Sequence, residues 1–109
     1  MAKTQEELDL IKGQLTSQYG KVYTIEIPAD EDEMEIRTIF LKKFDRATLS
    51  VVQKLAPNDS LKAVETFIKN TYIGGDDINE IMNNLDMLRS LESVVVELIS
   101  VKRAIIKKN

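Results

Sequence analysis

The hydrophobic positions of this chain change their period along the sequence, and these changes predict an α+β fold. Near the start, Thr4 and Glu7 have the spacing of a capping box that begins a helix. The apolar residues of this helix share one face, at Leu8, Ile11 and Leu15. The pair Tyr19 and Gly20 marks its end. Residues 1–20 are therefore expected to form a helix at the periphery of the fold.

Between residues 21 and 41 the hydrophobic period falls to two, which predicts two strands. In the first strand, Tyr23, Ile25 and Ile27 share one face. In the second, alternation places Met34, Ile36, Thr38 and Phe40 on that same main face, and Ile39 and Leu41 on the other. The acidic run at residues 30–33 is expected to be a solvated turn. We predict a two-stranded antiparallel hairpin, residues 21–41, packed on four or five helices.

Residues 45–109 are predicted to be helical, with one helix boundary at each cluster of capping residues. Asp45 and Ser60 are expected to cap the first two helices of this part. Gly74 and Gly75 are interpreted as the left-handed exit of the second of these helices. A second capping box, formed by Asp77 and Glu80, is expected to open a short third helix.

The long C-terminal helix, from about residue 86, has the clearest helical pattern. Its apolar positions include Leu88, Leu91, Val95, Leu98 and Ile105, of which Leu91, Val95 and Leu98 are expected to be buried. The same helix also carries Val94, Ile99, Val101 and Ile106. Its apolar arc is thus wider than one packing contact needs, and either the other elements of the chain or a partner covers the extra width.

Composition fits a single globular domain. The chain has 109 residues, of which 43% are hydrophobic and 30% charged. It contains no cysteine and no histidine, which removes disulfides, thiolate metal ligands and the usual general base near neutral pH. The start lacks an apolar signal region and no apolar run is long enough to span a membrane, so we expect a protein of the cytoplasm that does not enter a membrane.

The net charge of −3 hides an asymmetry between the two parts of the chain. Residues 1–35 carry nine acidic and three basic residues, whereas the remainder carries nine acidic and twelve basic ones. The basic residues do not form the dense stripe interleaved with aromatics that is typical of nucleic-acid binders. A nucleic-acid partner is therefore not expected.

No group of residues has the pattern of a catalytic, cofactor or metal site. Residues 30–33 lack the spaced ligands, the glycine and the terminal glutamate of an EF-hand loop. The serines have no histidine to activate them. The two carboxylates that follow Gly74 and Gly75 would repel a phosphate from the helix start there. We expect a protein that is not an enzyme, holds no cofactor, and works by binding another macromolecule.

Two sets of residues are candidates for partner binding. Val22, Ile39 and Leu41 are expected on the minor face of the hairpin, because a two-stranded sheet in a short chain is usually covered on one side only. Lys42, Lys43 and Arg46 form a basic patch where the second strand gives way to a helix. The expected partner is a protein, and a second copy of this chain is an alternative.

From Val22 to the C-terminus the chain resembles a family of viral proteins. The resemblance is carried by the segments FLKKFDR and DSLKAVETFIKNTYIGGDD and by the closing helix, and its most specific pieces are residues 40–46 and 59–76. These segments are similar to those of small tail-assembly-chaperone-like proteins of bacteriophages and prophages of gut Bacteroidetes. The family commonly has an aromatic residue before Gly-Gly-Asp, here Tyr72, but often has a proline where this chain has Phe44.

The resemblance implies a helper protein that is encoded by the virus but is not part of the virion. It implies binding to the tape measure protein or the tail tube protein in the bacterial host cytoplasm until the tail assembles. It carries over no functional residue, because the family has no site motif to match position by position. The alternative is a small virion structural protein or a regulator directed at a host enzyme.

Overall fold

The computed structural model describes residues 3–29 and 35–103, the last four of these by their backbone only. The elements follow the order α1 (Gln5–Tyr19), β1 (Val22–Pro28), β2 (Ile36–Lys42), α2 (Arg46–Leu55), α3 (Ser60–Thr71), β3 (Tyr72–Gly75), α4 (Ile78–Met82) and α5 (Leu85–Arg103). The fold is α+β, as the sequence predicts. Its sheet, however, has three strands rather than the predicted two.

The strands form an antiparallel sheet in the order β1-β2-β3, so β2 lies in the centre. The third strand includes Gly74 and Gly75, which the sequence suggested were a helix exit, and this interpretation is wrong. Gly75 has a φ of 112°, and a Cβ at this position would lie 2.5 Å from the carbonyl oxygen of Thr38. Glycine is required here because β3 approaches the backbone of β2 too closely for any side chain.

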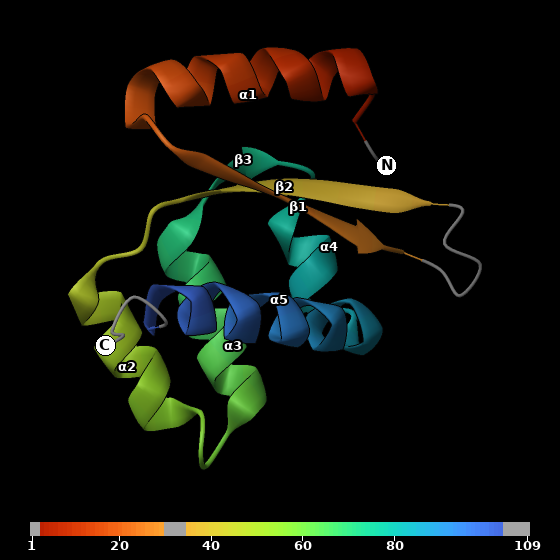
Figure 1. Cartoon of the computed structure of the whole chain (residues 1–109). Coiled ribbons are helices and arrows are strands. Elements are labelled where there is room, and N and C mark those ends of the chain that lie inside the picture. The colour runs from red at the N-terminus through yellow and green to blue at the C-terminus, as the bar shows by residue number, and fades with distance from the viewer. Residues whose placement is uncertain (1–2, 30–34, 104–109) are drawn as a thin grey trace.

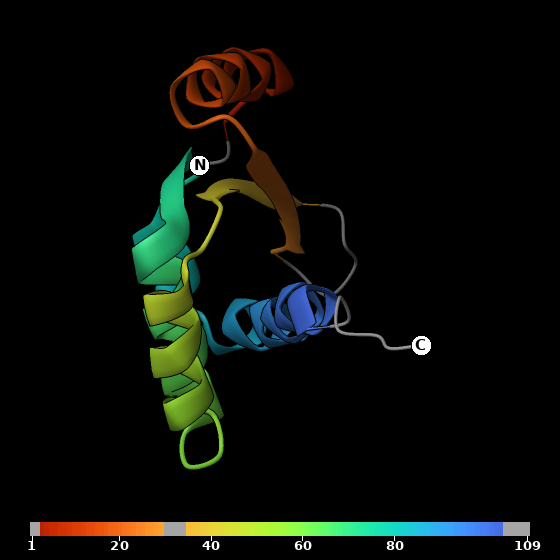
Figure 2. The ribbon, with the colours of Figure 1, turned by 60° about the vertical axis from the view of Figure 1, so that its left-hand side comes forward.

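Helices cover both faces of the sheet (Figure 1). α1 lies across one face, and α5 runs beneath the other, on the same side as α3 and α4 (Figures 1 and 2). In β2, the five residues 37–41 are therefore all buried, because a central strand with helices on both faces has no side toward water. The expectation of a sheet covered on one side only is wrong.

The register of the hairpin decides which side chains share a face. Ile25 pairs with Ile39, and Tyr23 pairs with Leu41. Directly paired residues of an antiparallel ladder point to the same face, so Ile39 and Leu41 lie on the main face and Phe40 lies on the other. The predicted assignment was the reverse and is wrong. The alternation within each strand does not determine which residues of the two strands pair. A shift of the pairing by one residue moves every side chain of one strand to the opposite face.

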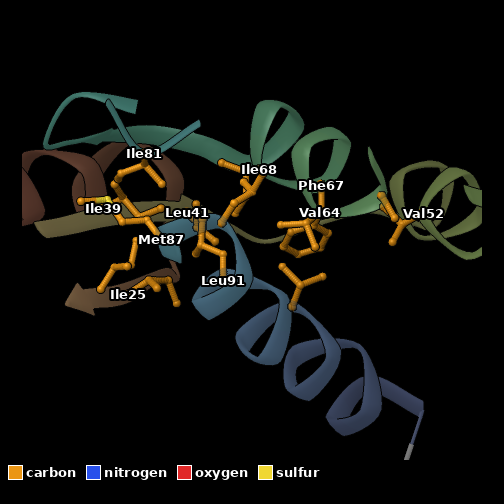
Figure 3. Packing of buried hydrophobic residues seen from close by; sticks show 14 of the residues in the cluster. Ile25, Ile39, Leu41, Val52, Val64, Phe67, Ile68, Ile81, Met87 and Leu91 are labelled. Carbon is orange, nitrogen blue, oxygen red and sulfur yellow. The ribbon is translucent and has the colours of Figure 1, made fainter. Parts of the chain in front are cut away.

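The main core lies between the sheet and the helices beneath it (Figure 3). Its labelled side chains come from the sheet, the α2–α3 pair, α4 and α5, and are Ile25, Ile39, Leu41, Val52, Val64, Phe67, Ile68, Ile81, Met87 and Leu91. Leu91 and Val95 are buried, as predicted. Leu98 is only half-buried, since α5 leads away from the sheet toward its C-terminal end (Figure 3).

The starts of α1 and α2 follow the capping signals in the sequence, whereas the start of α3 does not. Thr4 and Glu7 form the predicted capping box of α1, and the carboxylate of Asp45 accepts the backbone N–H of Thr48 at 2.8 Å. The cap of α3 is Asp59, whose carboxylate accepts the N–H of Lys62 at 3.0 Å. The prediction that Ser60 caps this helix is therefore one residue late: Asp59 has the side-chain acceptor and the position before the first turn.

Candidate functional site

β1 forms one edge of the sheet, opposite β3 (Figure 2). In the described part of the chain it pairs with β2 and with no other strand. The backbone N–H of Ala29 donates to the carbonyl of Glu35 at 2.7 Å, and hydrogen-bonded residues alternate along an antiparallel pair. Ile25 and Ile27 therefore direct their N–H and C=O groups toward β2. Those of Val22, Thr24 and Glu26 point outward, away from the sheet.

The side chains along this edge differ between the two faces. Toward α5, Ile25 and Ile27 are buried. Toward α1, Thr24 and Glu26 are exposed, so α1 leaves this part of its face uncovered. The outer edge of β1 thus offers a row of backbone donors and acceptors beside small or polar side chains. An edge of this kind can take up a further strand.

The predicted partner-binding residues of the hairpin fall in two places. Val22 lies at the beginning of the β1 edge and is half-buried. Ile39 and Leu41 are only 0% and 1% exposed, within the main core. Their expected position on an uncovered face is wrong, because the register turns both side chains toward α5. In the folded chain, a partner has no access to these two residues.

The predicted basic patch does lie on the surface. Lys42, Lys43 and Arg46 are all exposed at the junction of β2 and α2. Because Val22 pairs with Lys42, this patch lies at the end of the sheet where the β1 edge begins. Asp45, within the patch, caps α2, and the hydrogen bond from the backbone N–H of Thr48 lowers the pKa of its carboxyl. The patch therefore contains one carboxylate that is already used by the fold.

At the other end of the sheet, Asp76 joins three segments of the chain. Its Oδ2 accepts the N–H of Thr38 at 2.7 Å, and its own N–H donates to the carbonyl of Thr38 at 2.8 Å. Its Oδ1 accepts the N–H of Lys3 at 2.6 Å, next to the start of α1. The hydroxyl of Tyr72 donates to the Asp76 carbonyl at 2.9 Å. Burial raises the pKa of this phenol. Asp76 is 1% exposed, and its polar atoms are used in holding the structure together.

Next to Asp76, an ion pair joins β2 to α4. The guanidinium of Arg37 donates to both carboxylate oxygens of Glu80, from Nε at 3.0 Å and from Nη2 at 3.1 Å. The hydrogen bonds from Arg37 lower the pKa of Glu80. The predicted capping box of Asp77 and Glu80 is therefore wrong: Asp77 caps α4 by accepting the N–H of Asn79 at 2.9 Å, whereas Glu80 faces the buried guanidinium.

The described residues offer no group of acidic side chains that could hold a metal ion. Residues 30–33, considered above as cation ligands, lie outside the residues that the structure describes. No helix of the described chain is long and apolar enough to cross a membrane. Comparison with known proteins adds nothing to this geometry. The chain matches no family model, no curated protein and no solved structure.

Proposed function

We propose that this protein is a non-enzymatic binding protein that acts as a phage tail assembly chaperone. It holds the tape measure protein or the tail tube protein, its client, through the outer edge of β1 until the tail assembles. The observation that supports binding is the outer side of β1 (Val22–Pro28), because among the described strands β1 pairs with β2 alone and this side carries no further strand. The nature of the client rests on the resemblance of residues 40–46 and 59–77 to tail-assembly-chaperone-like proteins.

An edge strand suits a protein that must hold an unassembled client and later release it. An extended segment of the client would add to the sheet about 4.8 Å from β1. It would bond to the outward N–H and C=O groups of Val22, Thr24 and Glu26. Such main-chain bonds give affinity without demanding a particular client sequence. They also involve a small area compared with a permanent interface, which favours release.

The basic patch gives this binding a direction along the edge. Lys42, Lys43 and Arg46 lie at the end where β1 begins. A client segment with acidic residues near that end would be attracted, and one with basic residues there would be disfavoured. Because these side chains are exposed, added salt should weaken the attraction. The proposed site thus comprises the β1 edge and the basic patch.

The decisive variant is Thr24→Pro. The N–H of Thr24 points outward, so proline removes a donor from the open edge without removing a bond between β1 and β2. The matched control is Thr24→Val, which keeps the N–H and the branched shape. We expect Thr24→Pro to keep the fold and to capture tape measure or tail tube protein on the order of tenfold less well, since it removes one bond and obstructs its neighbours. Thr24→Val should capture the client like the natural chain.

Two results would count against the proposal. Equal capture by Thr24→Pro and Thr24→Val would show that the client does not use the β1 edge. Failure of the natural chain to capture either client, with both clients freshly expressed and unassembled, would overturn the chaperone function. Mass spectrometry of purified particles separates the remaining alternative: a chaperone is lost from the finished virion, whereas a structural subunit stays at a fixed ratio to the tail proteins.

A further inference from the structure

α1 contacts the rest of the described chain through one face. Leu8 is buried on this face. A Cβ at Gly74 would lie 3.3 Å from Cγ2 of Ile11 and 3.0 Å from Cδ1 of Leu15, so the helix rests directly on the glycine backbone of β3. Among the described residues, the polar contact that ties this segment to the sheet is the bond from Lys3 to Asp76. The opposite side of the helix is open, with Leu10 65% exposed.

The link between α1 and β1 is short and conformationally constrained. It consists of Gly20 and Lys21. Gly20 has a φ of 83°, in a region that residues with a side chain rarely adopt. A Cβ at Gly20 would meet nothing within 4 Å, so the constraint lies in the backbone conformation and not in crowding. Glycine holds this conformation without strain. In the alternative conformation, an extended link carries α1 away from its own sheet, and exchange of an identical element between two copies is a low-cost route to a dimer.

We propose that α1 exchanges between two copies of this chain. Each α1 swings out about Gly20 and docks on the sheet of the other copy, against Gly74 and Asp76. The fit needs no new surface, because the second copy's helix has the same residues as the one that it replaces. The difference between the two states is the hinge, which becomes extended in the dimer. This inference is independent of the client and of the β1 edge.

A pair of cysteines reports which copy supplies the helix. The natural chain has no cysteine, so Ile11→Cys with Gly74→Cys introduces the two thiols alone. A sulfur in the place of Ile11 Cγ2 would lie 3.3 Å from a Cβ at residue 74, near the separation that a disulfide needs. Oxidation joins the two positions within one chain when α1 docks on its own sheet. It joins two chains, as a covalent dimer on a non-reducing gel, when α1 has exchanged.

The hinge variant Gly20→Ala shifts the balance in a defined direction. Alanine raises the free energy of the monomer, in which φ is positive, but not that of the dimer with extended hinges. Since each dimer relieves two hinges, its dissociation constant should fall on the order of a hundredfold. Gly13→Ala is the matched control: it is the same chemical change, within α1, at a position where a Cβ also meets nothing within 4 Å. It should leave the dimer constant unchanged.

Sedimentation from micromolar to millimolar concentration measures this constant in the cysteine-free variants, so the test does not depend on how the added Gly74→Cys side chain is tolerated. We expect dimers that grow with concentration, that are strengthened by Gly20→Ala, and that crosslink through positions 11 and 74. Monomers throughout the range for both glycine variants would overturn the inference. So would a dimer that Gly20→Ala does not strengthen, because it would use another surface, such as the β1 edge. Since no client is present, neither outcome bears on the proposed chaperone function.

Discussion

Toward α5, the hairpin presents Tyr23, Ile25, Ile27, Ile39 and Leu41, which belong to the main core together with residues of α2, α3, α4 and α5. Toward α1, the same two strands present a mixture in which Phe40 is buried while Thr24, Glu26 and Lys42 are exposed. One helix covers part of this second face (Figure 1). The sheet thus separates a large apolar core from a small contact between α1 and the β2–β3 backbone.

This difference indicates where the stability of the fold comes from. Stabilisation by burial scales with the apolar area removed from water, and most of the buried apolar residues belong to the cluster on the α5 side. Elements with few buried contacts open at lower free energy than the core. We therefore expect α1 to leave the sheet in a local opening that precedes global unfolding, and the following changes test this division.

The largest expected effect is the loss of stability caused by Leu91→Ala. Leu91 is fully buried in the main core, so the cavity should lower the free energy of unfolding by about 2–5 kcal/mol. The matched change on the other face, Leu8→Ala, removes the same atoms from a buried residue of α1. Leu8→Ala cannot lower the free energy of global unfolding by more than the free energy with which α1 docks on the sheet. The effect of Leu8→Ala should therefore be much smaller than that of Leu91→Ala. Urea unfolding followed by circular dichroism measures both, and equal losses would show that the two faces unfold as one unit.

The comparison of the two faces also shows how far the sequence determines the fold. The period of two predicts the hairpin, and the buried Ile25 and Ile27 confirm its first strand. The phase of β2 relative to β1 could not be predicted, because β2 is apolar on both faces and either phase buries apolar side chains. Its double-sided pattern was nevertheless a signal of a central strand. A strand of this kind needs a second neighbour, and the residues around Gly74 supply it.

The third strand and the role of Asp76 were missed for a related reason. Gly-Gly after a helix is the usual sign of a left-handed helix end, and four residues are too few for a periodic strand signal. Asp76 follows these glycines and bonds to Lys3 and Thr38, which are far from it in the sequence. Local patterns do not contain such contacts. Of the candidate binding site, the basic patch was predicted from neighbouring charges, whereas the open edge required the strand order.

The next largest effect is expected from Asp76→Asn. The amide nitrogen of asparagine cannot accept a hydrogen bond, so either the N–H of Thr38 or that of Lys3 loses its acceptor. A buried N–H that has lost its acceptor lowers the free energy of unfolding by about 1–3 kcal/mol. The control is Asp77→Asn at the exposed neighbour, where asparagine caps a helix as well as aspartate does. Hydrogen exchange should also show faster exchange along α1 in Asp76→Asn. Unchanged exchange there would mean that Asp76 does not hold the helix on the sheet.

A smaller effect, with a pH dependence, is expected from Glu80→Gln. The pKa of Glu80 is lowered in the folded state by Arg37, so its pairing stabilises the fold above the unfolded pKa of about 4.3 and is lost as pH falls through the folded value. The decrease in the free energy of unfolding caused by Glu80→Gln should be constant above about pH 5 and should become smaller in more acidic solution. Glu97→Gln, at an exposed residue of α5 that forms no ion pair with described residues, is the control. If the natural chain remained more stable than Glu80→Gln in acid, Glu80 would stabilise the fold through packing rather than charge.

The smallest effect, and the sharpest test of the division between the faces, is expected from Gly13→Ala. In the middle of a helix, alanine is more favourable than glycine by up to about 1 kcal/mol, and the new Cβ meets nothing within 4 Å. If α1 opens before the main core, this gain should slow hydrogen exchange within α1 by about twofold to fivefold. The urea midpoint of the main core should not move, because α1 has already left the sheet at that point. A midpoint that rises by the full gain would show instead that α1 unfolds together with the core, and the two faces of the sheet would then form one cooperative structure.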